Sequence, residues 1–125
     1  MLNVSLVALG GAIGAAARYG VSLAFGSRAD AWPWATFAIN VSGSFLIGLL
    51  AGWLSSRGAV GEPWRLFIGV GILGGFTTFS AYSLETLRLI ERQDYTGAAL
   101  YSLGSVIAGL IAVAIGFTIA PKVTP

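Results

Sequence analysis

Long apolar stretches separated by short polar connections run through the whole sequence. Uncharged runs extend over residues 1–17, 31–56, 66–84 and 95–121. A helix needs roughly 20 predominantly apolar residues to cross the hydrocarbon core of a bilayer. The pattern therefore predicts an all-α membrane protein with one transmembrane domain over residues 1–125, and with helices at approximately 2–25, 32–56, 63–91 and 95–121.

The first apolar run ends at Arg18, but apolar residues resume through Phe25. We expect one helix with an arginine near its end, because a long arginine side chain can reach toward the membrane interface. A cleaved signal peptide is the less favoured interpretation, since no lysine or arginine precedes the apolar run.

Composition supports a membrane location and argues against enzymatic chemistry. Hydrophobic residues form 56% of the 125 residues and charged residues only 10%, whereas soluble domains carry roughly a quarter charged residues. The lack of cysteine and histidine in the sequence excludes disulfides, imidazole catalysis and the usual zinc or haem ligand sets. We predict neither an enzyme nor a nucleic-acid partner.

Basic residues are almost evenly divided between the two faces that four crossings define. One face receives Arg57, Arg65 and Lys122, and the other receives Arg18, Arg28, Arg88 and Arg92. An excess of lysine and arginine normally marks the cytoplasmic side. This balance leaves two interpretations open: dual insertion with antiparallel pairing, or a single orientation that other details determine.

Four short helices enclose little space, so polar groups on a pathway would need shielding by further helices. Self-association is therefore expected. Small residues at helical spacing are interpreted as positions of close helix packing: Gly10, Gly11, Gly14 and Ala15 to Ala17 in the first helix, and Gly43 and Gly48 in the second.

Asn40 is the most informative polar residue inside the second apolar run. Its amide must find hydrogen-bond partners at membrane depth, where unpaired polar groups are costly. An interhelical hydrogen bond and a donor that faces a polar pathway are equally good interpretations of this residue alone.

The segment GGFTTFSAYS, at residues 74–83, interrupts the third apolar run. Two glycines and two adjacent threonines disfavour a regular helix, so a local break near residues 74–80 is predicted. Freed backbone carbonyls at membrane depth are oxygen ligands suited to a hard cation such as sodium. A glycine-induced kink without an ion is the alternative.

Aromatic and hydroxyl side chains flank this segment at helical spacing. Phe79 and Tyr82 are three residues apart, and Tyr101 and Ser105 are four apart, so each pair shares one helix face. Positively polarised ring edges and hydroxyl donors can attract an anion without binding it tightly. Packing in the protein interior is the other interpretation, and it is the commoner one for aromatic residues.

Three stretches resemble the Fluc/CrcB fluoride channel family. GGAIGAAARYG at 10–20 is similar to the glycine-rich first helix of that family, and AINVSGSFLIG at 38–48 is similar to its asparagine-bearing second helix. GGFTTFSAYSLET at 74–86 resembles the family signature, GGxTTFSTFSxET. The last match is the most specific, and the resemblance extends over nearly the whole chain.

The resemblance implies an antiparallel, dual-topology homodimer with two pores at the subunit interface. Such a dimer passes fluoride passively across the bacterial plasma (inner) membrane and confers fluoride resistance. It also implies a structural sodium ion at the dimer interface, held by the backbone carbonyls of Gly74 and Thr77 from both copies. The helix break would then serve to release those carbonyls.

Residue by residue, the resemblance places Asn40, Phe79, Tyr82, Tyr101 and Ser105 on the anion pathway. It places Arg18 in an aqueous vestibule, where a positive charge attracts anions. Two positions depart from the family pattern. Tyr82 stands where the family has a phenylalanine, so its hydroxyl either donates to the anion or finds another partner, and Gly109 stands where the family has a serine.

Two other functions remain as alternatives. A small multidrug-resistance transporter also has four helices, but proton-coupled export requires a carboxylate in the first helix, and residues 1–25 contain none. Glu85 is the only acid near a helix interior. A membrane assembly factor that transports nothing would leave the polar break unexplained.

Overall fold

The protein is predominantly helical in the part of the chain that its computed structural model describes, residues 1–26 and 32–122. No strand occurs within these ranges. Along the sequence the elements are α1 (Leu2–Phe25), α2 (Trp34–Leu54), η1 (Gly58–Gly61), α3 (Glu62–Trp64), η2 (Arg65–Leu73), α4 (Gly74–Phe76), α5 (Phe79–Glu91) and α6 (Tyr95–Ile119). Of these, η1 is a 3₁₀-helix and η2 is a π-helix.

Four helical segments are long and apolar enough to cross a membrane. They are α1, α2, the composite segment Gly58–Glu91 and α6. The prediction of an all-α chain with four membrane-length helices is therefore confirmed. Arg28, which entered the count of basic residues, lies outside the described residues.

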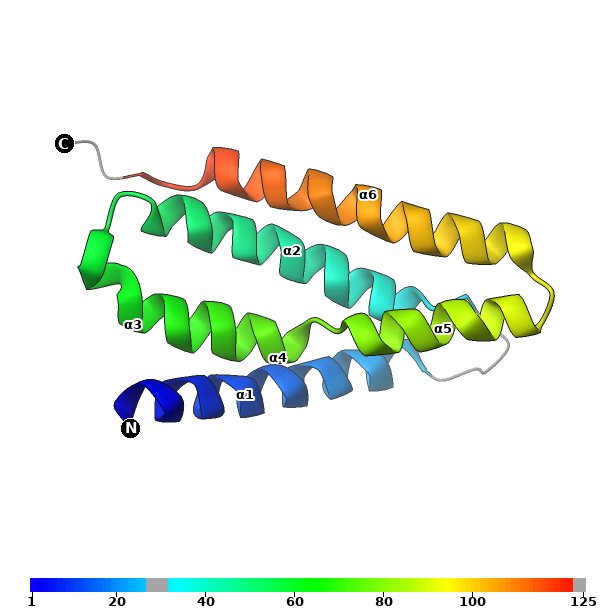
Figure 1. Ribbon diagram of the computed structural model, residues 1–125, viewed down its shortest axis with the longest axis horizontal. Coiled ribbons are helices and arrows are strands. Elements are labelled where there is room, and N and C mark those ends of the chain that lie inside the picture. Colours follow the sequence, from blue (N-terminus) through cyan, green and yellow to red (C-terminus); the bar gives the residue numbers. More distant parts are fainter. Residues whose placement is uncertain (27–31, 123–125) are drawn as a thin grey trace.

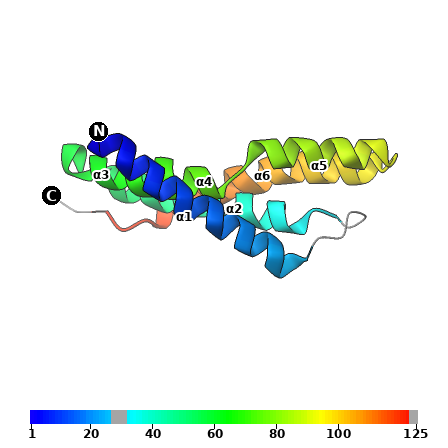
Figure 2. The same cartoon turned by 90° about the horizontal axis from the view of Figure 1, so that it is seen from below.

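The four segments lie side by side as an elongated bundle (Figure 1). In the half of the bundle that contains η2 and α4, α2 lies between α6 and the third segment, and α1 packs on the opposite side of η2 and α4. The start of α1 and the end of α6 lie at the same end of the bundle. Figure 2 shows that α5 follows α6 closely, whereas the last turns of α1 diverge from both.

Glycines allow backbones to approach closely along two of these contacts. A β-carbon at Gly10 would collide with the Phe67 carbonyl, and one at Gly14 would collide with the Ile72 carbonyl. In α2, a β-carbon at Gly48 would meet the Val113 carbonyl of α6. The prediction that glycines serve helix packing is confirmed at these three positions, whereas a β-carbon at Gly11 would meet nothing within 4 Å.

The third segment changes its helical geometry before it breaks. At the end of the π-helix the Gly74 N–H donates to the Gly69 carbonyl, five residues earlier, and also to the Gly71 carbonyl. The bond that spans five residues forms the wide turn of a π-helix, which often marks functional sites. After three residues of α-helix, Thr77 and Thr78 are extended, with φ, ψ of −80°, 154° and −150°, 120°. The predicted break in the third helix is confirmed.

Both threonines stabilise the helix ends beside the break. The Thr77 hydroxyl donates to the Leu73 carbonyl at 2.9 Å. The Thr78 hydroxyl caps α5 and accepts a hydrogen bond from the Ala81 N–H at 3.1 Å. A side-chain oxygen at this capping position replaces the carbonyl that the interrupted helix lacks.

Fully buried side chains gather where α5 packs on α6. Leu89, Ala98 and Tyr101 form this cluster, and Phe37 and Tyr82 pack against it. Many large apolar side chains elsewhere are exposed in the single chain, as expected for helices that face lipid or another subunit.

Candidate functional site

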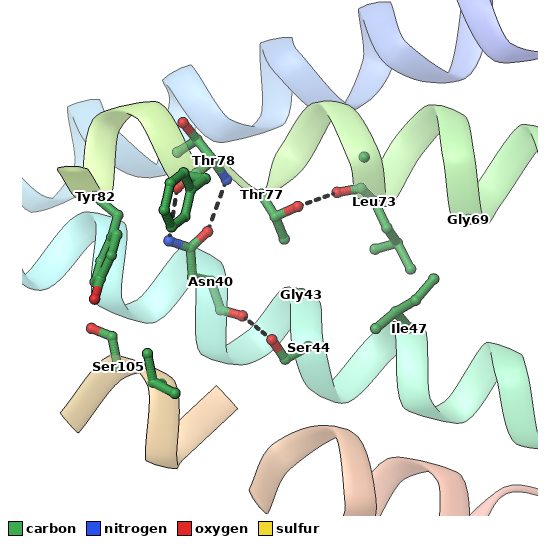
Figure 3. A pocket seen from close by; sticks show the side chains of 13 residues that line it. Asn40, Gly43, Ser44, Ile47, Gly69, Leu73, Thr77, Thr78, Tyr82 and Ser105 are labelled. Carbon is green, nitrogen blue, oxygen red and sulfur yellow. Dashed lines mark hydrogen bonds between the residues drawn. The ribbon is translucent and has the colours of Figure 1, made fainter. Parts of the chain in front are cut away.

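A cavity of about 450 Å³ lies beside the helix break. We call it the break cavity; it is bounded by α2, by the third segment on both sides of the break, and by α6 (Figure 3). Its walls consist of Asn40, Gly43, Ser44, Ile47, Gly69, Leu73, Gly74, Thr77, Thr78, Phe79, Tyr82, Ser105 and Val106. This lining contains an amide and several hydroxyls but no charged side chain.

Asn40 binds the extended backbone at the break. Its Nδ2 donates to the Thr78 carbonyl at 3.0 Å, and the Thr78 N–H donates to its Oδ1 at 2.9 Å. The side-chain amide therefore pairs with Thr78 as a neighbouring strand would. The interhelical hydrogen bond considered from the sequence is present. Because an amide nitrogen carries two hydrogens and Asn40 lines the cavity, one N–H remains for a further acceptor.

This pairing changes the hydrogen bonding of the preceding helix. In a continuous α-helix the Thr78 N–H would donate to the carbonyl of Gly74, four residues earlier. Because it donates to Asn40 instead, the Gly74 carbonyl loses that partner. The next carbonyl, of Gly75, accepts from Arg18 Nε at 3.2 Å.

Arg18 is thus half-buried against the break. Its guanidinium carries several other N–H groups, so a contact with the backbone and an attraction for anions are compatible. Its role in a vestibule remains a prediction.

Phe79 and Tyr82 are neighbours at the edge of the break cavity. Their ring centroids are 5.5 Å apart, and Phe79 is 79% exposed in the single chain. The Tyr82 hydroxyl donates to the Ser102 carbonyl of α6 at 2.8 Å. Of the two outcomes considered for this departure from the family pattern, the structure shows the hydroxyl bonded to another helix.

Tyr101 and Ser105 were predicted to share one face of the fourth helix, but their surroundings differ. Ser105 lines the cavity, and its Oγ is buried without a hydrogen-bond partner in the described part of the chain. Tyr101 is fully buried and does not line the cavity. Ser105 is therefore the hydroxyl that remains available for a ligand.

Glu85 is the partner of Tyr101, and this contact was not anticipated. The Tyr101 hydroxyl donates to Glu85 Oε2 at 2.8 Å, and Thr36 Oγ1 donates to Glu85 Oε1 at 2.8 Å. An ionisable residue within a membrane span is by itself a signal of function, and Glu85 could have been selected on that ground. Nothing in the sequence indicated the partners.

A row of aromatic rings connects the break cavity with Tyr101, the partner of the Glu85 carboxylate. From Phe79, successive ring centroids lie at 5.5 Å to Tyr82, 5.4 Å to Tyr101 and 5.1 Å to Trp32. These separations lie within the range of favourable aromatic contacts. A continuous row of rings therefore runs from the cavity toward the start of α2.

Gly109, the second departure from the family pattern, lies near Ser44 of α2. A β-carbon at Gly109 would lie 3.4 Å from Ser44 Oγ. That hydroxyl donates to the Asn40 carbonyl at 2.7 Å and lines the cavity. A hydroxyl from α2 therefore lies close to the position where the family's serine would be.

These features define a multi-pass membrane protein in which a broken third helix frames an uncharged polar cavity. The chain belongs to the CrcB family, because the family model described as CrcB-like protein, Camphor Resistance (CrcB), matches residues 5–117. The predicted family resemblance is confirmed.

Similar proteins are named fluoride-specific ion channel FluC. The one from Phenylobacterium zucineum (strain HLK1) is 53% identical over 125 residues, which cover 98% of each chain. The one from Methylobacterium nodulans is 50% identical over 113 residues, or 90% of this chain and 91% of the relative. That from Caulobacter sp. (strain K31) is 48% identical over 128 residues, with 98% of each chain covered.

Proposed function

We propose that this protein is a passive, fluoride-selective channel that exports fluoride across the bacterial inner membrane and so confers fluoride resistance. The observation that carries the proposal is the buried, unpartnered Ser105 hydroxyl in the uncharged break cavity. Relatives of nearly full length are named as fluoride channels and not as enzymes, in agreement with the prediction that the chain is not an enzyme.

The lining of the cavity suits an anion that must enter and leave. The Ser105 hydroxyl and the second Asn40 N–H are neutral donors, and the adjacent rings of Phe79 and Tyr82 offer polarised edges. A lysine or arginine would hold the anion more strongly, and conduction requires that binding remain weak enough for release. These neutral groups replace part of the hydration of fluoride without trapping it.

A second copy of the chain would complete the pathway. Phe79 is 79% exposed and Gly74 is also exposed beside the break, although polar backbone at membrane depth needs cover from protein or water. We infer that a homodimer covers this face, with a pore along each of the two equivalent cavities. The nearly even division of basic residues is compatible with antiparallel copies, which we propose.

We further infer a structural sodium ion between the copies, held by the backbone carbonyls of Gly74 and Thr77. The donor set fits: the usual N–H partner of the Gly74 carbonyl is bonded to Asn40, and Thr77 lies in extended backbone. No cluster of three acidic, histidine or cysteine side chains occurs in the described residues, so carbonyl oxygens are the hard ligands at hand. When bound, the ion supplies a positive charge that links the two copies.

Flux through the purified protein in liposomes tests the proposal. Vesicles loaded with potassium fluoride or potassium chloride are treated with valinomycin, and halide release is measured with ion-selective electrodes. We expect rapid fluoride release without a proton gradient, little chloride release, and no release from protein-free vesicles. Absence of fluoride release, or equal release of both halides, would contradict the proposal.

The same assay separates the alternative of a proton-coupled exporter, whose transport requires a proton gradient. Both carboxylate oxygens of Glu85 already accept hydrogen bonds from hydroxyls. Glu85 also does not line the break cavity, so the structure favours a channel over an exchanger at this site.

A further inference from the structure

Gly43 of α2 faces the helix break one turn after Asn40. It is buried, and a β-carbon at this position would collide with the γ-methyl group of Thr77. The next nearest atom is Phe76 Cδ2 at 3.5 Å. Figure 3 shows that Thr77 faces Gly43 of α2, and both residues line the break cavity.

Thr77 has little freedom to avoid such a collision. Its hydroxyl donates to the Leu73 carbonyl at 2.9 Å, and a β-branched side chain has few accessible χ1 rotamers. Turning the γ-methyl group away from α2 would break this hydrogen bond. Without rotation, the Thr77 backbone itself would have to move.

We propose that Gly43 is a positioning residue that sets the place of the Thr77 carbonyl in the sodium site. This inference rests on the proposed function, and it assigns to Gly43 a role beyond helix packing. Asn40 fixes Thr78 by two hydrogen bonds, and Gly43 allows Thr77 to approach α2 in the same turn. The two residues together hold both extended residues of the break against one helix face.

A double-mutant cycle tests this role. The variants are G43A, T77S and G43A/T77S, because serine lacks the γ-methyl group but keeps the hydroxyl that bonds Leu73. G104A is the matched control: it makes the same change within a membrane helix, but a β-carbon there would meet nothing within 4 Å. Each protein is compared in sodium chloride and in N-methylglucamine chloride.

The first readout is the sodium-dependent shift in the melting temperature of the detergent-purified protein, and the second is fluoride flux in liposomes. We expect G43A to abolish the sodium-dependent shift and to lower flux at least tenfold. In the T77S background, G43A should lower flux less than threefold. The double variant should show the same sodium-dependent shift in melting temperature as T77S alone. G104A should match the wild type.

The inference is overturned if G43A keeps the sodium-dependent shift and normal flux. It is equally overturned if T77S does not relieve the defect, including the case in which both variants with alanine at position 43 fail to fold. A wild type that conducts fluoride but shows no sodium effect would refute the inference and leave the channel proposal intact. A wild type without fluoride flux would refute the channel proposal itself.

Discussion

Replacing Asn40 by aspartate should stop fluoride conduction. The substitution exchanges the Nδ2 donor, which lies 3.0 Å from the Thr78 carbonyl, for an oxygen that cannot donate when ionised. The other oxygen still accepts the Thr78 N–H, as Oδ1 does at 2.9 Å in the wild type. N40D therefore removes one of two hydrogen bonds and adds a negative charge to the cavity wall.

The charge has the larger effect. One interhelical hydrogen bond in a membrane contributes about 0.6 kcal/mol on average and at most about 1.7 kcal/mol. A carboxylate about 4 Å from an anion repels it by about 4 kcal/mol at an effective dielectric constant near 20. Since each 1.4 kcal/mol corresponds to about tenfold in occupancy, fluoride occupancy should fall about a thousandfold.

The assay is fluoride release from liposomes, combined with thermal unfolding in detergent, for the wild type, N40D and N40A. Alanine removes both hydrogen bonds to Thr78 but adds no charge, so N40D should be the poorer conductor of the two variants. Fluoride release by folded N40D within tenfold of the wild type would refute the placement of Asn40 on the pathway. Equal loss of flux in both variants would show that the contact with Thr78, and not the charge, decides conduction.

Three other variants address separate parts of the pathway. F79I should abolish fluoride release because it removes the exposed ring edge, while size-exclusion chromatography shows the same oligomeric state as for the wild type; normal release would refute the role of the ring. S105A should lower release about tenfold, with an unchanged or slightly higher melting temperature because the hydroxyl it removes is buried and unpaired; undiminished release would show that this hydroxyl does not contact the anion. T96C adds a single thiol to a chain without cysteine and leaves the basic residues unchanged, so an impermeant thiol reagent should label about half the molecules from outside intact cells, whereas complete or absent labelling would refute dual topology.

The break in the third helix could be predicted because its cause is local. Gly74, Gly75, Thr77 and Thr78 are adjacent in the sequence, and each disfavours a regular helix through its own backbone or side chain. The π-helix Arg65–Leu73 was not predicted. Glycines at 69 and 71 are equally compatible with an α-helix, whereas a hydrogen bond that spans five residues, such as that from the Gly74 N–H to the Gly69 carbonyl, is typical of a π-helix.

The partners of the polar side chains could not be predicted, because they are distant in the sequence. Thr36 and Glu85 are 49 residues apart, and Tyr82 and Ser102 are 20 apart. Helical spacing places Tyr101 and Ser105 on one face, but it does not specify which neighbouring helix meets each of them. The antiparallel dimer and the sodium ion remain predictions, since both depend on contacts beyond a single chain.

The side chains that bind the backbone at the break belong to α1 and α2, whereas the unpartnered Ser105 hydroxyl belongs to α6. From α1, Arg18 binds the Gly75 carbonyl, and from α2, Asn40 binds both polar groups of Thr78. Ser105 of α6 takes no part in these contacts, and its hydroxyl is unpartnered within the described residues. Because the break is held without Ser105, the proposed binding and release of an anion at this hydroxyl would not break a contact of the extended backbone. A break held by other helices, beside an unpartnered donor, suits the weak binding that the proposed passive conduction requires.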